Sequence, residues 1–278
     1  MKKSKAETLK SLEKKLKHFK IPKTYFFNFN DWKNKKSHIL KKIKLKFRKK
    51  IAVRSSAMDE DKLSGSQAGK YLSFLNVDKN NKNELIKKIS NLFKSYGKNS
   101  KGENNQILVQ DMIKNIKMSG VIFTHDADNN SPYYCINYDD ISGKSDTVTA
   151  GRGIYSNKSL YLLRGKENKL KSKRFINLIN AVKELENMVG DNEIDIEFAL
   201  TKQNILYLLQ VRPLVKKKIV NKKLFKKISD RVLNVEKKLK FKFKKDKYLC
   251  GKTTVFGQMP DWNPVEMIGL HPSKLAFS

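Results

Sequence analysis

Cysteine is scarce in this sequence. The only two, Cys135 and Cys250, lie too far apart along the chain to form a metal-binding motif or a disulfide framework. A reducing, cytoplasmic location is therefore expected. Apolar runs are short, residues 205–209 being among the longest, so no segment is expected to span a bilayer. The basic residues 1–5 are not followed by the apolar stretch of a signal peptide.

Arginine is also rare, although the chain is strongly basic. Its 60 Lys and Arg outnumber 27 Asp and Glu, which gives a net charge of +33, but only seven of the 60 are Arg. Arg is the side chain that reads bases and grips phosphates in a bidentate way. The Lys residues are spread over the whole chain with many Asn and Ile, which is typical of an AT-rich genome. No specific nucleic acid is expected as a partner, although the charge alone predicts nonspecific attraction.

The spacing of apolar residues predicts a mixture of helices and strands. Helices are expected over residues 7–19, 84–96 and 175–189, and a basic amphipathic segment over residues 33–50. Gly190 is expected to cap the last helix. Short strands are expected over residues 51–53, 71–77, 106–112, 120–124, 133–138 and 160–163. Residues 193–200 and 205–211, separated by a polar turn, predict a β-hairpin.

The predicted hairpin carries the most informative side chains. Alternate residues of a strand share a face, so Asp195 and Glu197 point one way, and Gln210 and Arg212 share a face on the returning strand. With the turn centred between the two strands, Asp195 is expected opposite Gln210. Two carboxylates are hard oxygen ligands that suit Mg²⁺, and a nearby Arg suits the phosphate that the metal bridges. An exposed polar face with a chance ion pair would produce the same pattern.

A second candidate site follows the predicted strand over residues 51–53, which runs into Arg54 and two hydroxyl side chains. The acidic residues 59–61 and the small-residue run 64–69 come next, and small residues let backbone N–H groups approach an anion closely. This is not a Walker A loop, because the Gly-x4-Gly-Lys-Ser/Thr spacing is absent. An ordinary turn after a strand is the alternative.

Two further segments contain residue types that could carry chemistry. Residues 139–153 combine glycines, hydroxyls and acids, which could face a nucleotide or form a plain surface loop. His125 stands directly after the predicted strand 120–124, where no acid–base partner can be assigned to it from the sequence. A structural role is therefore expected for His125.

Three segments, in this order, resemble the nucleotide domain of the phosphoenolpyruvate synthase and pyruvate phosphate dikinase family. They are VRSSA (53–57) leading to FLNV (74–77), VQDMI (109–113) leading to SGVIFT (119–124), and DIEF (195–198) leading to LYLLQVRPL (206–214). Their order and spacing agree with the family over about residues 1–215. The resemblance implies an α+β, ATP-grasp-type fold, in which ATP lies between two lobes with Mg²⁺ at its phosphates.

The resemblance also implies roles for individual residues. The implied nucleotide-binding positions are Lys5, Arg54, Gln110, Met112, Thr149, Gly151, Gln210 and Arg212. Among them, Arg54 and Arg212 match the arginines at the phosphates and are the expected catalytic residues. Asp195 and Glu197 match the family's metal-side acids.

Some of these correspondences are less direct than others. Gln110 and Met112 lie on the strand expected near the adenine. Lys5 corresponds to the lysine of a Gly-Gly-Lys motif, but both glycines are missing here. Thr149 and Gly151 match a Ser/Gly position that follows the third loop.

The resemblance divides the chain into four parts. They are an N-terminal lobe (1–105), a second lobe with the hairpin (106–215), a Lys-rich linker (216–248) and the start of a further segment (249–278) that looks truncated. The complete enzymes of the family pass phosphate through a swivelling His domain to pyruvate on a barrel. The sequence contains neither a Gly-Gly-x-x-Ser-His segment nor the barrel, and none of its four His residues stands in such a context.

The function implied is that of an ATP- and Mg²⁺-binding phosphotransferase module of the kinase type. Its phosphate acceptor is expected on a separate chain that carries the phospho-His and pyruvate-binding domains. A nucleotide-binding remnant or regulatory module without catalysis is the alternative. A basic protein that binds nucleic acid is a third reading, which rests on the net charge alone.

Overall fold

The computed structural model describes residues 4–57, 72–97, 105–128, 130–148 and 157–214, and a few residues between 227 and 248. The chain divides into two compact units, residues 1–221 and residues 222–278, and the fold described below is that of the first unit. The predicted site residues Thr149 and Gly151, most of the predicted linker and all of residues 249–278 lie outside the described residues. In the described part of the chain, no helix is long and apolar enough to cross a membrane.

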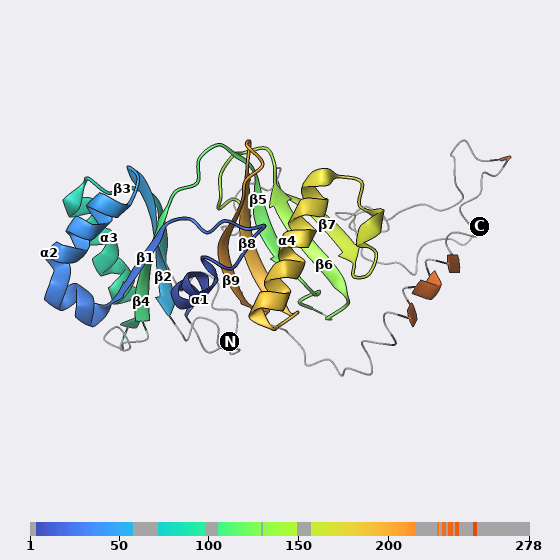
Figure 1. Cartoon of the computed structure of the whole chain (residues 1–278), viewed down its shortest axis with the longest axis horizontal. Coiled ribbons are helices and arrows are strands. Elements are labelled where there is room, and N and C mark those ends of the chain that lie inside the picture. Colours follow the sequence, from blue (N-terminus) through green and yellow to red (C-terminus); the bar gives the residue numbers. More distant parts are fainter. Residues whose placement is uncertain are drawn as a thin grey trace, which may run out of the picture. The chain divides into compact units, whose positions relative to one another are not determined.

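The first sheet has four antiparallel strands in the order β1-β4-β2-β3 (Figure 1). They are β1 (Thr24–Asn28), β2 (Lys50–Ala57), β3 (Ser73–Asp78) and β4 (Asn105–Asp111). Helices α2 (Phe29–Lys46) and α3 (Lys82–Ser95) cover one face. Alternation along the strands decides which side chains meet these helices: Ile51 and Val53 join the helical core, whereas Arg54 points to the opposite face.

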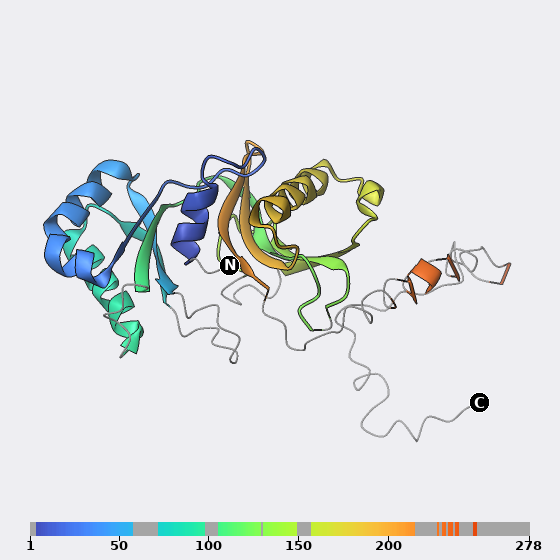
Figure 2. The same ribbon diagram turned by 60° about the horizontal axis from the view of Figure 1, so that its bottom comes forward.

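The second sheet has five antiparallel strands in the order β7-β6-β5-β8-β9 (Figure 2). They are β5 (Ile116–Phe123), β6 (Tyr133–Asp139), β7 (Asn157–Leu163), β8 (Ile194–Thr201) and β9 (Leu206–Pro213). The short 3-10 helix η3 (Glu167–Lys169) precedes helix α4 (Lys173–Val189), whose apolar side packs on one face of this sheet. Gly190 ends α4 with a left-handed φ of 70°, as predicted.

Helix α1 (Lys5–Leu12) contacts both sheets (Figures 1 and 2). Its start is fixed by a capping box in which Ser4 and Glu7 satisfy each other's backbone N–H groups. Leu9 and Leu12 are buried in the core of the second sheet. The N–H of Ala6 donates to the Ser56 hydroxyl of β2 over 3.0 Å, so the first turn is tied to the first sheet.

The structure confirms the predicted α+β class and the hairpin, and it differs from the predictions at three points. Strand β1, with its run of aromatic residues, was not predicted. Helix α1 ends at Leu12 instead of residue 19: residues 13–15 form a turn, and beyond it the N–H groups of Lys17 and His18 donate to the Glu184 carboxylate. The predicted lobe boundary at residue 105 falls before β4, which pairs in the first sheet, so the two sheets divide between β4 and β5.

Candidate functional site

The two acids of the hairpin lie on the face of the second sheet that is turned away from α4. Ile196 and Phe198 are fully buried in the core beneath α4. Asp195 and Glu197 alternate with them and therefore point to the other face, as predicted. On β9, Gln210 is paired with Glu197 and Arg212 with Asp195. The prediction that Asp195 lies opposite Gln210 was therefore wrong by two residues, although the shared face was right.

A β-bulge at Leu209 produces this register. Phe198 pairs with Leu208 and Glu197 pairs with Gln210, so Leu209 is an extra residue on β9. If Leu209 instead paired regularly with Glu197, Gln210 and Arg212 would lie opposite Ile196 and Ile194 on the core face. A one-residue shift in register turns every later side chain to the other side of the sheet. The bulge therefore aligns the acids, the amide and the guanidinium on one face.

Arg54 joins this group from the other sheet. Its Nη1 donates to Oε2 of Glu197 over 2.9 Å, with both side chains largely buried. Within the hairpin, Nε of Arg212 donates to Oδ2 of Asp195 over 2.7 Å. The site therefore combines residues 143 positions apart in the chain and is completed only when the two sheets come together. Buried pairs of this kind are weak evidence for stability, because the desolvation of two charges offsets their attraction.

The pKa values of the two carboxyl groups are shifted in opposite directions. Burial raises the pKa of Asp195 to about 6, against the opposing pull of the Arg212 guanidinium. Burial also acts to raise the pKa of Glu197, but the charges of Arg54 and Lys5 outweigh it and hold that pKa below its ordinary value. Lys5, which is 8% exposed at the start of α1, acts electrostatically on both carboxyl groups.

Two buried polar atoms in this group suit a bound ligand. Among the described residues, Oδ1 of Asp195 and Nε of Arg54 have no hydrogen-bond partner. Buried polar atoms are usually paired, and an unpaired one costs free energy. The Asp195 oxygen is a hard metal ligand that suits Mg²⁺. The Arg54 N–H can donate a hydrogen bond to a phosphate oxygen.

The small number of acids fits Mg²⁺ better than a fully protein-bound metal. In the part of the chain that the structure describes, no three His, Cys, Asp or Glu residues gather to form a metal centre. Mg²⁺ commonly takes one or two carboxylates and completes its shell with waters and substrate phosphates. Asp195 and Glu197 supply that number of carboxylates.

Two further predicted residues, Gln110 and Met112, lie at the end of β4. Gln110, buried on β4, donates through Nε2 to the carbonyl of Leu209 at the bulge, a long contact of 3.4 Å. Met112 follows β4 and its N–H donates to the carbonyl of Lys50. His125 is buried, with 2% of its surface exposed.

A hydrogen-bond network that the sequence analysis missed holds α1 against the first sheet. Ser4 donates to Oε1 of Gln106 on β4, and the Gln106 amide donates to Glu7. The Tyr96 hydroxyl accepts from the N–H of Ser56 and donates to the carbonyl of Gln106. This network fixes the position of the turn that carries Lys5. The Ser-x-x-Glu spacing of the capping box was the available sequence signal.

Asp139 organises the described part of the predicted loop 139–153. Its carboxylate accepts from the N–H groups of Ile141 and Ser142 and from the hydroxyls of Ser142 and Thr147. Burial acts to raise the pKa of Asp139, but these hydrogen bonds hold it well below the ordinary value. Ser119 on β5 also donates to the carbonyl of Lys144 over 2.6 Å. The described part of the loop is therefore anchored on β6 and on β5, the neighbour of β8.

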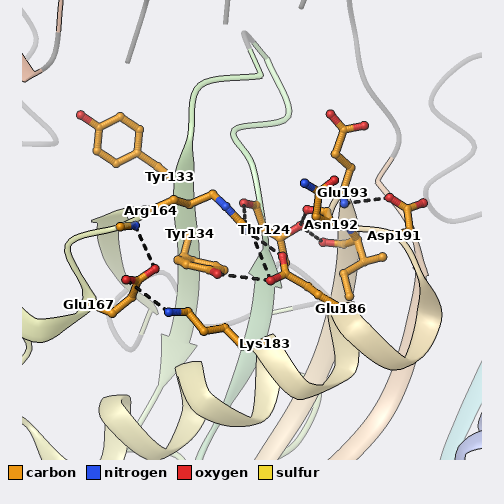
Figure 3. Close-up of polar contacts among 12 residues, drawn as sticks. Thr124, Tyr133, Tyr134, Arg164, Glu167, Lys183, Glu186, Asp191, Asn192 and Glu193 are labelled. Atoms are coloured by element: carbon orange, nitrogen blue, oxygen red, sulfur yellow. Dashed lines mark hydrogen bonds and ion pairs between the residues drawn. The ribbon is translucent and has the colours of Figure 1, made fainter. Parts of the chain in front are cut away.

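A separate polar cluster fastens α4 to the opposite face of the second sheet. Figure 3 shows Arg164 and Tyr134 pointing toward Glu186 of α4. Arg164 donates two hydrogen bonds to Glu186, of 2.7 and 3.2 Å, and a third to the carbonyl of Thr124. Tyr134 belongs to the core beneath α4, so the sheet separates this cluster from Asp195. Its role is to hold the helix in place.

The two antiparallel sheets and their helices form an α+β fold, and both sheets supply residues to the carboxylate–arginine site. Residues 30–153 match the family model described as the AMP/ATP-binding domain of pyruvate phosphate dikinase. This match confirms the predicted resemblance over those residues, which include Arg54 but not the hairpin acids. A search of curated proteins finds no match.

Solved structures with a similar arrangement include several ligases. D-alanine–D-alanine ligase from Helicobacter pylori is 13% identical, with a TM-score of 0.43 and coverage of 81% of this chain and 57% of the ligase. L-amino acid ligase from Bacillus licheniformis is 13% identical, with a TM-score of 0.43 and coverage of 76% of this chain and 43% of that ligase. D-Ala:D-Ser ligase from Enterococcus faecalis is 12% identical, with a TM-score of 0.42 and coverage of 83% of this chain and 60% of that ligase. The chain therefore spans about half the length of these ligases.

Proposed function

We propose that this chain is an ATP- and Mg²⁺-binding phosphotransferase module that holds its nucleotide in ATP-grasp fashion at the junction of its two sheets. The observation that carries the proposal is the contact of Arg54 on one sheet with Glu197 on the other, over 2.9 Å. Phosphoryl transfer depends mainly on positioning and on stabilising charge, and it needs cations at the phosphates and acids for the metal. The junction provides both.

The proposed division of roles follows the charges. Arg54, Arg212 and Lys5 are cations that would contact phosphate oxygens, and the two arginines would also stabilise the charge that develops during transfer. Asp195 and Glu197 would hold Mg²⁺, which when bound neutralises part of the phosphate charge.

The ion pairs are proposed to exchange partners when the nucleotide binds. Without it, each carboxylate neutralises one guanidinium, Glu197 that of Arg54 and Asp195 that of Arg212. A guanidinium can leave its carboxylate and bind a phosphate only if another cation, such as Mg²⁺, then binds the carboxylate. Otherwise the carboxylate would be a buried charge without compensation, which costs about 3–5 kcal/mol. Nucleotide and Mg²⁺ are therefore expected to bind together far better than either does alone.

The adenine is proposed to lie near Gln110 and Met112, at the crossing between the sheets. The small buried apolar cluster of Ile116, Ala199 and Leu209 adjoins that crossing through Leu209, which Gln110 contacts. Because the Gln110 amide donates to the backbone at Leu209, its proposed role is to hold the two sheets around the base. Gln210, opposite Glu197, is proposed to contact the phosphate end of the nucleotide.

On the basis of the family resemblance, the phosphate acceptor is proposed to reside on a separate chain with a phospho-His domain. A cytoplasmic setting is part of the same proposal. Thr149 and Gly151 retain their proposed place near the nucleotide, on the basis of the family resemblance and the matched range.

Isothermal titration with a non-hydrolysable ATP analogue, with and without Mg²⁺, tests the proposal. The parent should bind the analogue in a Mg²⁺-dependent way, and Glu197→Gln should lose most of that binding. Glu167→Gln is the matched control, since Glu167 pairs with Lys183 elsewhere in the unit and its substitution should leave binding unchanged. A folded parent that binds no analogue would overturn the proposal and favour a module without nucleotide chemistry.

A further inference from the structure

A pocket of about 270 Å³ lies in the helical layer of the first sheet, between α2 and the start of α3. It belongs to the face covered by helices, whereas Arg54 points from the opposite face of the same sheet. The residues that line it are Ser37, Leu40, Lys41, Lys44, Lys79, Asn80, Lys82 and Leu85. None of them belongs to the proposed nucleotide site.

The lining is far more basic than the chain as a whole. With 60 Lys and Arg and 27 Asp and Glu among 278 residues, eight average residues would include about two basic residues and about one acidic residue. The pocket has four lysines and no acid. The strong overall charge therefore does not by itself account for the composition of this pocket.

Lys79 gives one wall of the pocket a defined structure. Its ammonium group donates to the carbonyl of Lys44 over 2.5 Å and also to the carbonyl of Phe47, both at the end of α2. These carbonyls lack partners within the helix, so the cation caps the negative end of the helix dipole. The turn before α3 is thereby fixed against α2.

Acids near the pocket are engaged elsewhere. Asp78 accepts from the N–H of Asn80 and lies 3.8 Å from the ammonium of Lys50. Glu84, in the first turn of α3, pairs with Lys88 over 2.5 Å. Neither of these carboxylates lines the pocket, and each has a cation of its own.

We propose that this pocket binds a small phosphate-bearing anion, of which pyrophosphate and inorganic phosphate are the simplest members. Lys41, Lys44 and Lys82 supply point charges of the kind that bind phosphate, and the hydroxyl of Ser37 and the amide of Asn80 can donate hydrogen bonds. The volume lies below the range of about 300–1,000 Å³ that is common for drug-sized ligands, so a compact ligand fits best.

The test is isothermal titration of the full chain with pyrophosphate and with inorganic phosphate, at about 0.15 M salt to screen long-range attraction. All samples carry Glu197→Gln, so that failure of the proposed nucleotide site cannot change the result. The pocket variant is Lys41→Gln/Lys44→Gln/Lys82→Gln. The control variant is Lys33→Gln/Lys87→Gln/Lys171→Gln, which removes the same charge from exposed lysines outside the pocket.

Saturable binding of one anion per chain is expected, with affinity about tenfold or more weaker in the pocket variant and within about twofold of the parent in the control. Preference for one anion identifies which member of the class occupies the site. Equal losses in the two variants would overturn the proposal in favour of nonspecific attraction. Tighter binding of a short DNA duplex than of pyrophosphate, abolished only in the pocket variant, would overturn it in favour of a nucleic-acid backbone.

Discussion

Arg54 of β2 donates a 2.9 Å hydrogen bond to Glu197 of β8, and this contact joins the two sheets of the fold. Both side chains are largely shielded from water, so each relies on the other for compensation. The contact therefore connects the stability of the fold with its proposed chemistry.

Removing one partner of this pair should destabilise the protein more than removing both. Arg54→Met or Glu197→Met leaves a buried charge unpaired, which is expected to lower the free energy of unfolding by about 3–5 kcal/mol. The double variant leaves neither charge unpaired and should therefore cost less than either single change. Urea unfolding of the four proteins measures this coupling, and strictly additive losses would contradict it.

The bulge at Leu209 allows a sharper test of the site. Deleting Leu209 removes only the extra residue and leaves Gln210 opposite Glu197 and Arg212 opposite Asp195, so the deletion variant should still bind the Mg²⁺–nucleotide analogue. Leu209→Ala keeps the chain length and should retain binding while costing about 2–5 kcal/mol of stability through lost packing. Titration and urea unfolding of both variants separate the two effects. A folded deletion variant that no longer binds the analogue would contradict the assignment of Leu209 as the extra residue.

The faces of the site strands could be predicted from the sequence, but their pairing could not. Alternation in a strand has a period of two, so Asp195 and Glu197 had to share a face whatever the partner strand did. The register depends on Leu209, and nothing in the run from Leu206 to Arg212 marks that leucine as the extra residue. Bulges are set by how two strands fit a whole sheet, which local sequence does not contain.

The position of Lys5 illustrates a second limit. The capping box that begins α1 is a local pattern and can be read from the sequence. The end of α1 and its place against both sheets depend on Glu184, Ser56 and Gln106, which are distant in the chain. Tertiary contacts of this kind override local propensity, and for that reason the helix is shorter than its apolar spacing predicts.

Asp139 should make the protein sensitive to acid. Its folded-state pKa lies below the ordinary value, so the unfolded state binds the proton more readily as the pH falls. The contribution of Asp139 is fully present above about pH 5 and is lost as the pH falls below about 4, the ordinary value for Asp. At pH 7, Asp139→Asn is expected to cost about 1–3 kcal/mol, because charge-assisted hydrogen bonds are lost. Urea unfolding between pH 7 and pH 3 should show this difference shrinking, and a constant difference would exclude the charge as its cause.

Gly120 lies on β5, directly beside the backbone of β6. A Cβ added there would meet the carbonyl oxygen of Asn137 at 2.1 Å, so Gly120→Ala requires the backbone to move. A cost of about 3 kcal/mol or more is expected. Gly190→Ala is the comparison: it meets no atom within 4 Å, but it places alanine at a φ of 70°, at a cost of about 1–2 kcal/mol. Thermal or urea unfolding that ranks the two variants equally would contradict the close approach.

Lys5 can be tested against a second lysine on the same helix. Lys5 is buried and acts on both site carboxyl groups, whereas Lys10 is exposed and pairs with Glu13 over 2.6 Å. Lys5→Met should weaken binding of the Mg²⁺–nucleotide analogue by about 1.5–3 kcal/mol, the range for hydrogen bonds to charged groups, which corresponds to roughly 10- to 150-fold. Lys10→Met should change the affinity by less than about twofold, because a surface pair contributes little. Equal effects of the two substitutions would mean that Lys5 acts only through the net charge of the chain, and the phosphate contact proposed for it would have to be withdrawn.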